Sequence, residues 1–464
     1  MKPYGFSDDV PQRMNDPLNS DVRIERSRVF ESTDWLSFTL VTIVTLVVYL
    51  WTLAPNVTLE FSGILCAGAM YCGVPHPPGY PLWTIYAWLS TVLLPFSNIA
   101  WRVAVSSAVA ASLASGLVAL IASRGSATMI DGISPLQRLT HKEASALRIV
   151  SGIVSGSALA FDGGFWCRAV VVDTWPFSVL LFCTVVCLLT RWFYRPDQWR
   201  HLYGAFFVYG LALSNSQALA TGGLGLQLLI TFGNPKLGRD LFFTNTLFIA
   251  AVLAGIHAGC WDTISLEVIY LWIGITSTML CIALTIKTQG FLTEWKTLLV
   301  LGTSFLVGLA MYLYVPLASM SNPPVNWGYP RTVTGFIHTV TRGQYERIYP
   351  TDSFRRSLEQ MHLYGEVAVK HFGIIYIALA LVPFCLLHRM PLRTRSWMLG
   401  LAALYLSFTL LLLVTLNPSS DMQSQDVSKV FFSASHLVIA ICSGCGVTLV
   451  AALLNSHQRE TRLR

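Results

Sequence analysis

Long runs of apolar residues, separated by short polar segments, follow one another along the chain. A run of about 17–25 apolar residues is long enough to cross the hydrocarbon core of a bilayer as an α-helix. The run 219–232 is shorter and contains Gly-Gly-Leu-Gly near its start, which favours a half-helix or a broken span. The pattern predicts about twelve transmembrane helices, at residues 35–54, 102–123, 149–166, 174–190, 201–218, 219–232, 241–260, 264–285, 297–318, 371–388, 397–416 and 433–454.

The composition agrees with an integral membrane protein. Hydrophobic residues make up 54% of the 464 residues, charged residues only 12%, and the mean hydropathy is +0.57. A soluble domain needs a more highly charged surface, so this class is excluded. We predict an all-α polytopic membrane protein with one transmembrane domain at 35–454, between polar tails at 1–34 and 455–464. The first apolar run follows a long polar segment, which is typical of an anchor and not of a cleavable signal.

The distribution of positive charge predicts the topology. Cytoplasmic segments of membrane proteins are enriched in lysine and arginine. If the apolar segment 81–97 lies along the outer face as a juxtamembrane helix, most of the 31 basic side chains fall in inner segments, including the basic segment 124–148. A crossing at 81–97 would place that segment outside. We therefore expect two cytoplasmic termini and two large outer loops, at 55–101 and 319–370, which face the periplasm or a lumen.

The first outer loop contains a rigid proline-rich turn, Pro75-His76-Pro77-Pro78. Proline fixes its own φ and restricts the preceding residue to extended conformations. Such a turn can aim the imidazole of His76 at a phosphate or a sugar hydroxyl, or it can cap the 81–97 helix, and both interpretations stay open. Cys66 and Cys72 of the same loop could form a disulfide in an oxidising compartment.

The second outer loop combines arginine with aromatic residues. Arginine binds phosphate oxygens through a planar fork, and aromatic rings suit both sugar faces and the membrane interface. The alternative is a basic aromatic belt next to anionic lipid headgroups. We favour a functional role for Arg342 and Tyr345, and the belt for Arg355 and Arg356.

Five segments carry a resemblance to a known family. They are GVPHPPGYPL at 73–82, FWCRAVVVDTW at 165–175, GLALSNSQAL at 210–219, NPPVNWGYP at 322–330 and TRGQYERI at 341–348. They resemble segments of a family of GT-C-fold membrane glycosyltransferases, long labelled a domain of unknown function, which includes a eukaryotic transmembrane protein O-mannosyltransferase. The resemblance covers nearly the whole chain and identifies a divergent, short member.

This resemblance implies a GT-C-like helical bundle that transfers a sugar, with inversion, from a polyprenyl-phosphate donor to a protein or glycan acceptor on the outer face. The chain departs from the family at several positions. Phe61-Ser62-Gly63-Ile64 stands where the family has Asp-Ser-Gly-Glu, Asp173 where Glu is usual, and Ser216 where the family has His. Glu60 is the only acid between Asp34 and Asp131, so it is the candidate that replaces the missing carboxylates.

The candidate site residues follow from these segments. A carboxylate is the usual general base for a hydroxyl acceptor, and cationic donors stabilise a leaving phosphate. The simpler alternatives are a solvated Glu60 and a structural ion pair between Asp173 and Arg168; Asp162 is a further acid near a predicted helix end. The predicted catalytic residues are Glu60 and Asp173, and the predicted substrate-binding residues are His76, Asn326, Trp327, Arg342, Tyr345 and Arg347.

Two other function classes stay open. A carrier or flippase for lipid-linked solutes would also have about twelve helices, but carriers place their sites near the bilayer midplane, and the long polar outer loops favour a transferase. A catalytically silent partner subunit is suggested by the missing family carboxylates. The sequence predicts membrane lipids as partners, no nucleic acid, and no metal-ligating motif such as HExxH or paired CxxC; whether a divalent metal is needed stays open.

Overall fold

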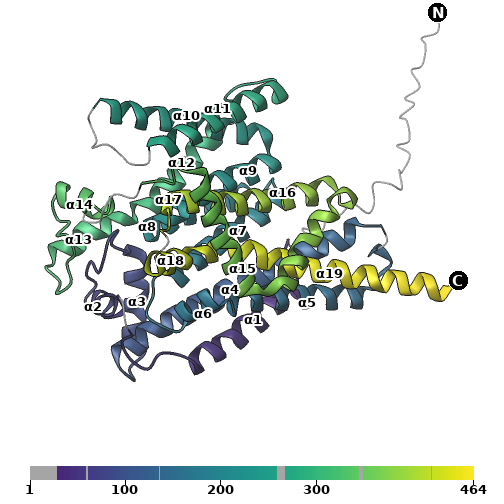
Figure 1. The fold of residues 1–464 in the computed structure, drawn as a ribbon, viewed down its shortest axis with the longest axis horizontal. Coiled ribbons are helices and arrows are strands. Elements are labelled where there is room, and N and C mark those ends of the chain that lie inside the picture. Colours follow the sequence, from purple (N-terminus) through teal and green to yellow (C-terminus); the bar gives the residue numbers. More distant parts are fainter. Residues whose placement is uncertain are drawn as a thin grey trace, which may run out of the picture.

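The computed structural model describes residues 29–58, 61–134, 136–258, 267–343, 349–419 and 421–463. Within these ranges the regular elements are helices, and the extended pairing is a single isolated bridge. Figure 1 shows long helices side by side along one direction. The predicted all-α polytopic class is therefore confirmed.

Nine helical segments of the described chain are long and apolar enough to cross a membrane. The bent pair α5 (His141–Ala160) and α6 (Gly163–Ala169), which meet at 72°, would make ten. The sequence predicts about twelve. The difference lies in α8 (Trp199–Asn215) and α9 (Gly223–Gly233), which have only 17 and 11 residues, so the run 219–232 is indeed short.

The long helices form a buried bundle and a more exposed margin. Most of α4 and α19 is buried, because alanine, serine and glycine dominate their buried positions and allow neighbouring backbones to approach closely. In contrast, most of α10, α11 and α12 faces outward. The long helical segments are α1 (Ser32–Trp51), α4 (Ile99–Gly132), α7 (Trp175–Tyr194), α10 (Pro235–His257), α11 (Glu267–Thr288), α12 (Trp295–Leu309) with its continuation to Met320, α15 (Phe354–Cys385), α16 (Leu392–Leu406) with its continuation to Leu416, and α19 (Ser433–Leu463).

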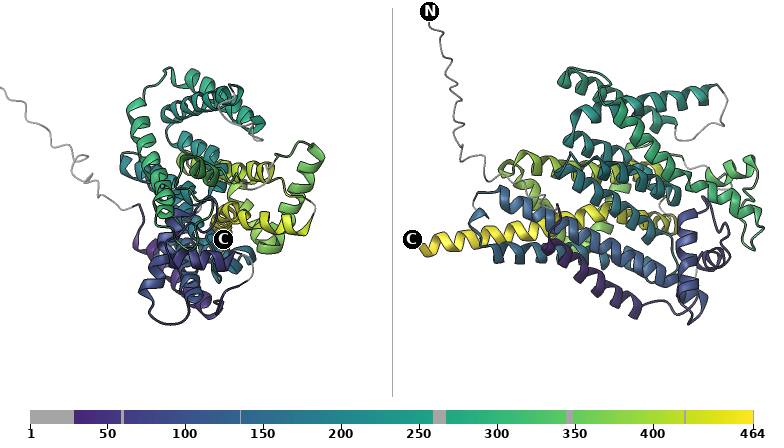
Figure 2. Two further views of the ribbon diagram at one scale, coloured as in Figure 1. Left: turned by 90° about the vertical axis from the view of Figure 1, so that its left-hand side faces the viewer. Right: turned by 180° about the vertical axis from the view of Figure 1, so that it is seen from behind.

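Short helices complete the architecture, and several of them gather at one end of the bundle. We call this end, formed by α2 (Ser62–Met70), α3 (Pro81–Leu93), α13 (Tyr314–Met320) and α14 (Val333–Val340), the loop end. Figures 1 and 2 show α3 running across the direction of the long helices. Its 13 residues are too few to cross a bilayer, which agrees with the juxtamembrane helix predicted at 81–97. The remaining short helices are α17 (Leu412–Leu416) and α18 (Met422–Lys429).

The opposite end of the bundle carries an ion-pair network. Arg148 of α5 donates to Asp34 at 2.8 Å and to Glu31 at 2.7 Å, and Arg124 of α4 donates to Glu31 at 3.0 Å. Asp34 is fully buried although it lies in the first turn of α1, because Arg148 neutralises its charge. We call this end the ion-pair end.

Three basic segments meet at the ion-pair end. The Thr128 hydroxyl lies 3.2 Å from the hydroxyl of Tyr194, and Arg393 donates to the carbonyl oxygen of Phe193. These contacts join the predicted inner segment 124–148 to residues 191–200 and 389–396. The predicted topology, with both termini in the cytoplasm, stays a prediction.

Two boundaries and one bond differ from the sequence analysis. Helix α4 continues to Gly132, inside the predicted inner loop, and α15 begins at Phe354, inside the predicted outer loop 319–370. Cys66 and Cys72 are both free thiols, so the disulfide is absent from the structure.

Candidate functional site

The two predicted outer loops pair with each other at the loop end. Val74 donates its backbone N–H to the carbonyl of Val325 at 2.9 Å, and Trp327 donates to the carbonyl of Val74 at 2.9 Å. These bonds form the isolated parallel bridge between Val74 and Asn326. Segments about 250 residues apart in sequence are therefore paired. His76 lies in one of these segments and Trp327 in the other.

His76 lies at the centre of an aromatic cluster. Its side chain is 8% exposed, and its ring centroid lies 4.6 Å from that of Phe61, 5.7 Å from that of Trp327 and 6.1 Å from that of Tyr80. Its Nδ1 lies 2.8 Å from the carbonyl oxygen of Pro77. A carbonyl oxygen only accepts, so Nδ1 carries the proton and Nε2 of the neutral ring is an acceptor.

Burial lowers the pKa of His76 below its ordinary value, and the charge of Arg342 lowers it further, against the opposing bond to Pro77. The imidazole is therefore neutral near pH 7. The alternative role as a helix cap is not supported, because the residue at the N-cap of α3 is Tyr80 and the helix begins at Pro81.

Arg342 approaches the same turn from the second loop. It follows the C-terminus of α14 with φ of 58°, a backbone conformation that costs free energy in a residue other than glycine. Its Nη2 donates to the carbonyl of Pro77 at 3.3 Å, so that one carbonyl oxygen joins Arg342 and His76. Its Nε is buried without a hydrogen-bond partner, and no carboxylate among the described residues forms an ion pair with this guanidinium.

Asn326 and Trp327 are neighbours in the second loop, and the ring of Trp327 lies beside that of His76. The amide of Asn326 donates to the carbonyl of Ser319 at 3.2 Å, whereas its Oδ1 is buried with no partner within the described ranges. The indole of Trp327 is 37% exposed. Gln217 ties this region to the bundle, since its side chain donates to the carbonyl of Val340 at 2.7 Å.

The structure therefore brings together four of the predicted site residues: His76, Asn326, Trp327 and Arg342. We call this group the loop cluster. It combines a guanidinium that has no carboxylate partner in the described chain, a neutral imidazole, an amide oxygen and a partly exposed indole. Such a set can bind an anion next to a sugar ring. Glu60, Tyr345 and Arg347 lie outside the described residues.

Asp173 takes part in a different set of contacts. Its carboxylate accepts from Arg168 at 3.1 Å and from the backbone N–H of Trp175 at 2.7 Å, and its backbone carbonyl accepts from the indole of Trp83 at 3.1 Å. These bonds connect α3 to the start of α7. The geometry matches the alternative interpretation, a structural ion pair with Arg168, and its predicted catalytic role stays a prediction.

A buried cluster escaped the sequence analysis. Asp162 is 1% exposed, and its Oδ2 lies 2.7 Å from Nδ1 of His436 and 3.1 Å from Nδ1 of His371. The two histidines stand 274 and 209 residues further along the chain, on α19 and α15. The only signal in the sequence was the isolated acid in Phe-Asp-Gly-Gly, because nothing local links it to either histidine.

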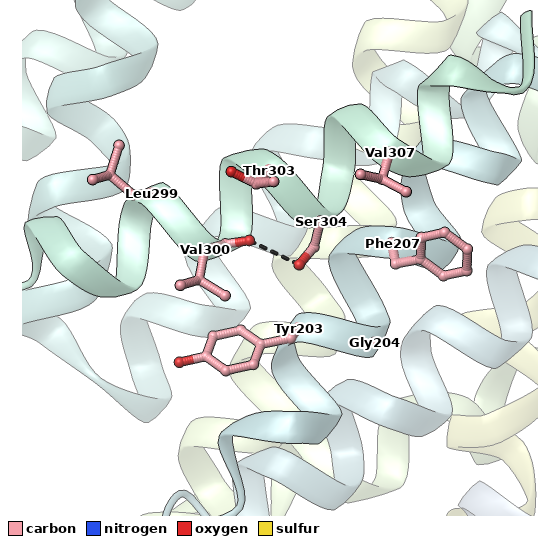
Figure 3. A pocket seen from close by; sticks show the side chains of 8 residues that line it. All are labelled: Tyr203, Gly204, Phe207, Leu299, Val300, Thr303, Ser304 and Val307. Atoms are coloured by element: carbon pink, nitrogen blue, oxygen red, sulfur yellow. Dashed lines mark hydrogen bonds between the residues drawn. The ribbon is translucent and has the colours of Figure 1, made fainter.

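A shallow groove between α8 and α12 contains none of the predicted site residues. It has a volume of about 550 Å³ and is lined mainly by apolar side chains, and Figure 3 shows the hydroxyl of Ser304 bonded to the carbonyl of Val300 in its own helix. The groove therefore offers few polar groups to a substrate. Its lining residues are Tyr203, Gly204, Phe207, Leu299, Val300, Thr303, Ser304 and Val307.

Comparisons with known proteins agree with the resemblance read from the sequence. A family model described as the Protein O-mannosyl-transferase TMEM260 N-terminal domain matches residues 62–236. A Dictyostelium discoideum protein named Protein O-mannosyl-transferase tmem260 is 22% identical over 425 residues, which cover 89% of this chain and 44% of that protein. A Mus musculus protein named Protein O-mannosyl-transferase TMEM260 is 39% identical over 95 residues, covering 19% of this chain and 14% of that protein.

No solved structure matches the chain. The chain spans less than half the length of these two relatives. The predicted resemblance to an O-mannosyltransferase-like family of membrane glycosyltransferases is confirmed. The family model includes His76 and ends before the second loop.

Proposed function

We propose that this chain is a membrane glycosyltransferase that moves a sugar, with inversion, from a polyprenyl-phosphate donor to a protein acceptor on the outer face. The names of the two relatives suggest mannose as the sugar. The observation that carries the proposal is the loop cluster, in which Arg342 from the second loop meets His76 from the first at the carbonyl of Pro77.

Arg342 binds the donor phosphate in this proposal. Its guanidinium has no carboxylate partner in the described part of the chain, so its charge is available to an anion. The phosphate gains negative charge as the sugar leaves, and a preorganised cationic donor stabilises that charge more than it stabilises the ground state. The positive φ of Arg342 supports such preorganisation, because strained backbone conformations cluster at functional sites.

His76 and Trp327 contact the sugar. The neutral imidazole of His76 can accept a hydrogen bond from a sugar hydroxyl at Nε2, since its Nδ1–H is already bonded to Pro77. The exposed part of the Trp327 indole offers an apolar face to the ring, and the unpaired Oδ1 of Asn326 offers a further acceptor.

Glu60 is the proposed general base that takes the proton of the acceptor hydroxyl. It is near the loop cluster in sequence, next to Phe61, whose ring contacts His76. Asp173 is the second candidate, although its carboxylate already accepts from Arg168 and Trp175. Tyr345 and Arg347 are proposed as further substrate-binding residues on the resemblance of their segment alone.

The position of the loop cluster favours this proposal over a carrier. A carrier would need its polar site near the midplane of the bundle, whereas His76 precedes α3 and Arg342 follows α14, two helices of the loop end. A silent partner subunit is favoured by one observation only, that Phe61 and Ile64 stand at the acid positions of the family. The transfer assay below separates a transferase from a silent partner subunit.

The test uses the full chain, purified and reconstituted in lipid nanodiscs. Radiolabelled polyprenyl-phosphate mannose and a pool of unmodified acceptor proteins are added, and label in the protein fraction is counted. We expect transfer by the wild-type chain and strongly reduced transfer by Arg342→Ala. Arg355→Ala is the matched control, because Arg355 lies in the first turn of α15, within the predicted outer segment 319–370, with a side chain that is 90% exposed.

Absence of transfer by the folded wild-type chain, with donors carrying several different sugars, would overturn the proposal in favour of a silent subunit. If the chain, reconstituted in sealed vesicles, moves labelled donor across the vesicle membrane and labels no protein, the result would instead indicate a carrier.

A further inference from the structure

The buried cluster of Asp162, His371 and His436 has the composition of a metal site. The three side chains come from the junction of α5 and α6, from α15 and from α19. One potential ligand atom from each lies within 4.8 Å of the other two. We propose that these three residues bind one divalent transition-metal ion, and that the ion is Zn²⁺.

The donor atoms favour zinc over magnesium and calcium. Two imidazole nitrogens and one carboxylate oxygen suit zinc and its neighbours in the first transition row, whereas magnesium and calcium prefer oxygen ligands alone. Zinc with three protein ligands keeps a fourth position for water or for a substrate oxygen. Tetrahedral bonds of about 2.0–2.1 Å place ligand atoms about 3.3 Å apart, so the observed separations of 2.7 and 3.1 Å need to widen by about 0.6 and about 0.2 Å.

The charge balance of the cluster also favours a cation. Among the described residues, Asp162 forms ion pairs only with the two histidines, which are charged only if protonated. A buried carboxylate without a positive partner is costly. The side chain of His436 is 1% exposed, and its Nε2 has no hydrogen-bond partner in the described chain. A divalent cation bound by the three side chains would supply a positive charge to the carboxylate.

The local backbone makes room for the three side chains. The axis turns by 72° between α5 and α6, where Asp162 caps α6 by accepting from the backbone N–H of Phe165 at 2.9 Å. Helix α15 is interrupted at Gly373, two residues after His371, with φ of 71° and ψ of 158°. A Cβ on Gly164 would lie 3.0 Å from Cε1 of His371. Three separate backbone features therefore converge on the cluster.

The ion would have a mechanical role. The side chain of His371 is 15% exposed, so one ligand of the cluster reaches the surface. Zinc would bind α6, α15 and α19 to one another. Ser433, one turn before His436, accepts a hydrogen bond from the indole of Trp175 at 2.5 Å, which extends the connection to α7. This inference does not depend on the proposed sugar transfer.

The experiment measures the metal directly. The full chain is purified through an affinity tag that contains no histidine, with no metal in the buffers, and its metal content is determined by mass spectrometry. The chain is then stripped with a chelator and titrated with Co²⁺, whose visible d–d absorption reports a tetrahedral site. The variants are Asp162→Asn, His371→Ala and His436→Ala. His362→Ala is the matched control. His362 lies on α15, the helix that carries His371, and its side chain is 75% exposed.

We expect about one metal ion per chain in the wild-type and His362→Ala proteins, and close to none in the three cluster variants. A folded wild-type chain that binds neither zinc nor cobalt would overturn the proposal and leave a hydrogen-bonded cluster only. Retention of the ion by both His371→Ala and His436→Ala would overturn it as well. If the cluster variants do not fold, the cobalt spectrum of the wild-type chain decides, because absence of the tetrahedral bands contradicts the site.

Discussion

Two arginines at opposite ends of the molecule have different partners. Arg148 at the ion-pair end is held by two carboxylates, those of Asp34 and Glu31, at 2.8 and 2.7 Å. Arg342 at the loop end donates to one backbone carbonyl at 3.3 Å, and no carboxylate of the described residues pairs with it. An arginine paired with two carboxylates holds helices together, whereas an arginine without a carboxylate partner in the described chain can bind an anionic ligand.

The backbone around the two arginines differs in the same sense. Arg148 lies in the regular helix α5, whose start is capped by reciprocal bonds between Thr140 and Glu143. At the loop end, Tyr80, Tyr329 and Arg342 all have positive φ. Such conformations persist only where the surrounding contacts over-determine them, and they are concentrated at functional sites. Substitutions at the ion-pair end should therefore affect stability, and substitutions at the loop end should affect activity.

Replacement of the proposed base should have the largest effect. Glu60→Gln keeps the size of the side chain and removes its ability to accept a proton. We expect transfer to fall by about 10²–10⁴-fold, the usual contribution of a general base. The check is the rate of label transfer at matched protein amounts in nanodiscs. If Glu60→Gln keeps full turnover, Asp173→Asn becomes the next variant to measure, and silence of both would refute the mechanism.

Removal of the paired arginine should destabilise the fold. Arg148→Ala leaves the fully buried carboxylate of Asp34 without its cation. Breaking a buried ion pair in this way costs about 3–5 kcal/mol. We expect a lower thermal midpoint in detergent, and a matching loss of activity only where the protein has unfolded. An unchanged midpoint would show that the ion-pair end does not hold the bundle together as described.

Much of the fold could be predicted from the sequence because length and hydropathy alone limit how a helix can sit in a bilayer. The prediction failed where polar residues are buried by partners far away in sequence. Residues 124–132 look like a loop, yet they continue α4, because Arg124 is neutralised by Glu31 and the hydroxyl of Ser126 donates to that of Ser151 at 2.7 Å. Such compensation depends on tertiary contacts and leaves no local pattern.

The candidate site was partly predictable for a related reason. The turn around His76 and the segment containing Arg342 are recognisable as continuous motifs, and the structure adds that they meet at Pro77. The Asp162 cluster has no such motif, since its histidines lie on two distant helices. Only the packing of α6, α15 and α19 brings those three side chains together.

Arg342→Ala should reduce transfer by about 10²–10³-fold, because it removes a preorganised donor from the leaving phosphate. Arg342→Lys should restore only part of the rate, since an ammonium cannot reproduce the two-pronged guanidinium contact. The thermal midpoint of Arg342→Ala should change much less than that of Arg148→Ala. The measurements are transfer rate and thermal midpoint on the same preparations.

The control for this prediction is Arg355→Ala. Its exposed guanidinium pairs with Glu359 on the surface of α15, so both transfer and stability should stay close to wild type. Equal losses of transfer at Arg342 and Arg355 would mean that the second loop acts as an electrostatic belt and that the phosphate binds elsewhere.

The smallest expected effect is a dependence of loop-end stability on pH. Burial and the charge of Arg342 lower the pKa of His76 in the folded chain below the ordinary value of 6.5. The unfolded chain therefore binds the proton more readily, and the stability that comes from the neutral ring is complete above pH 6.5 and is lost as the pH falls from 6.5 through the folded pKa. The carboxyl of Glu31, whose pKa is lowered from the ordinary value of 4.5, adds its own loss of stability only at pH below that value.

We expect the thermal midpoint of the wild-type chain to fall over that interval, and His76→Gln to flatten the slope, since glutamine keeps a polar side chain without a titrating group. His362→Gln, at an exposed position on α15, should keep the wild-type slope. If His76→Gln and the wild-type chain lose stability in parallel, the imidazole is not the titrating group, and the neutral acceptor assigned to it at the sugar would have to be abandoned.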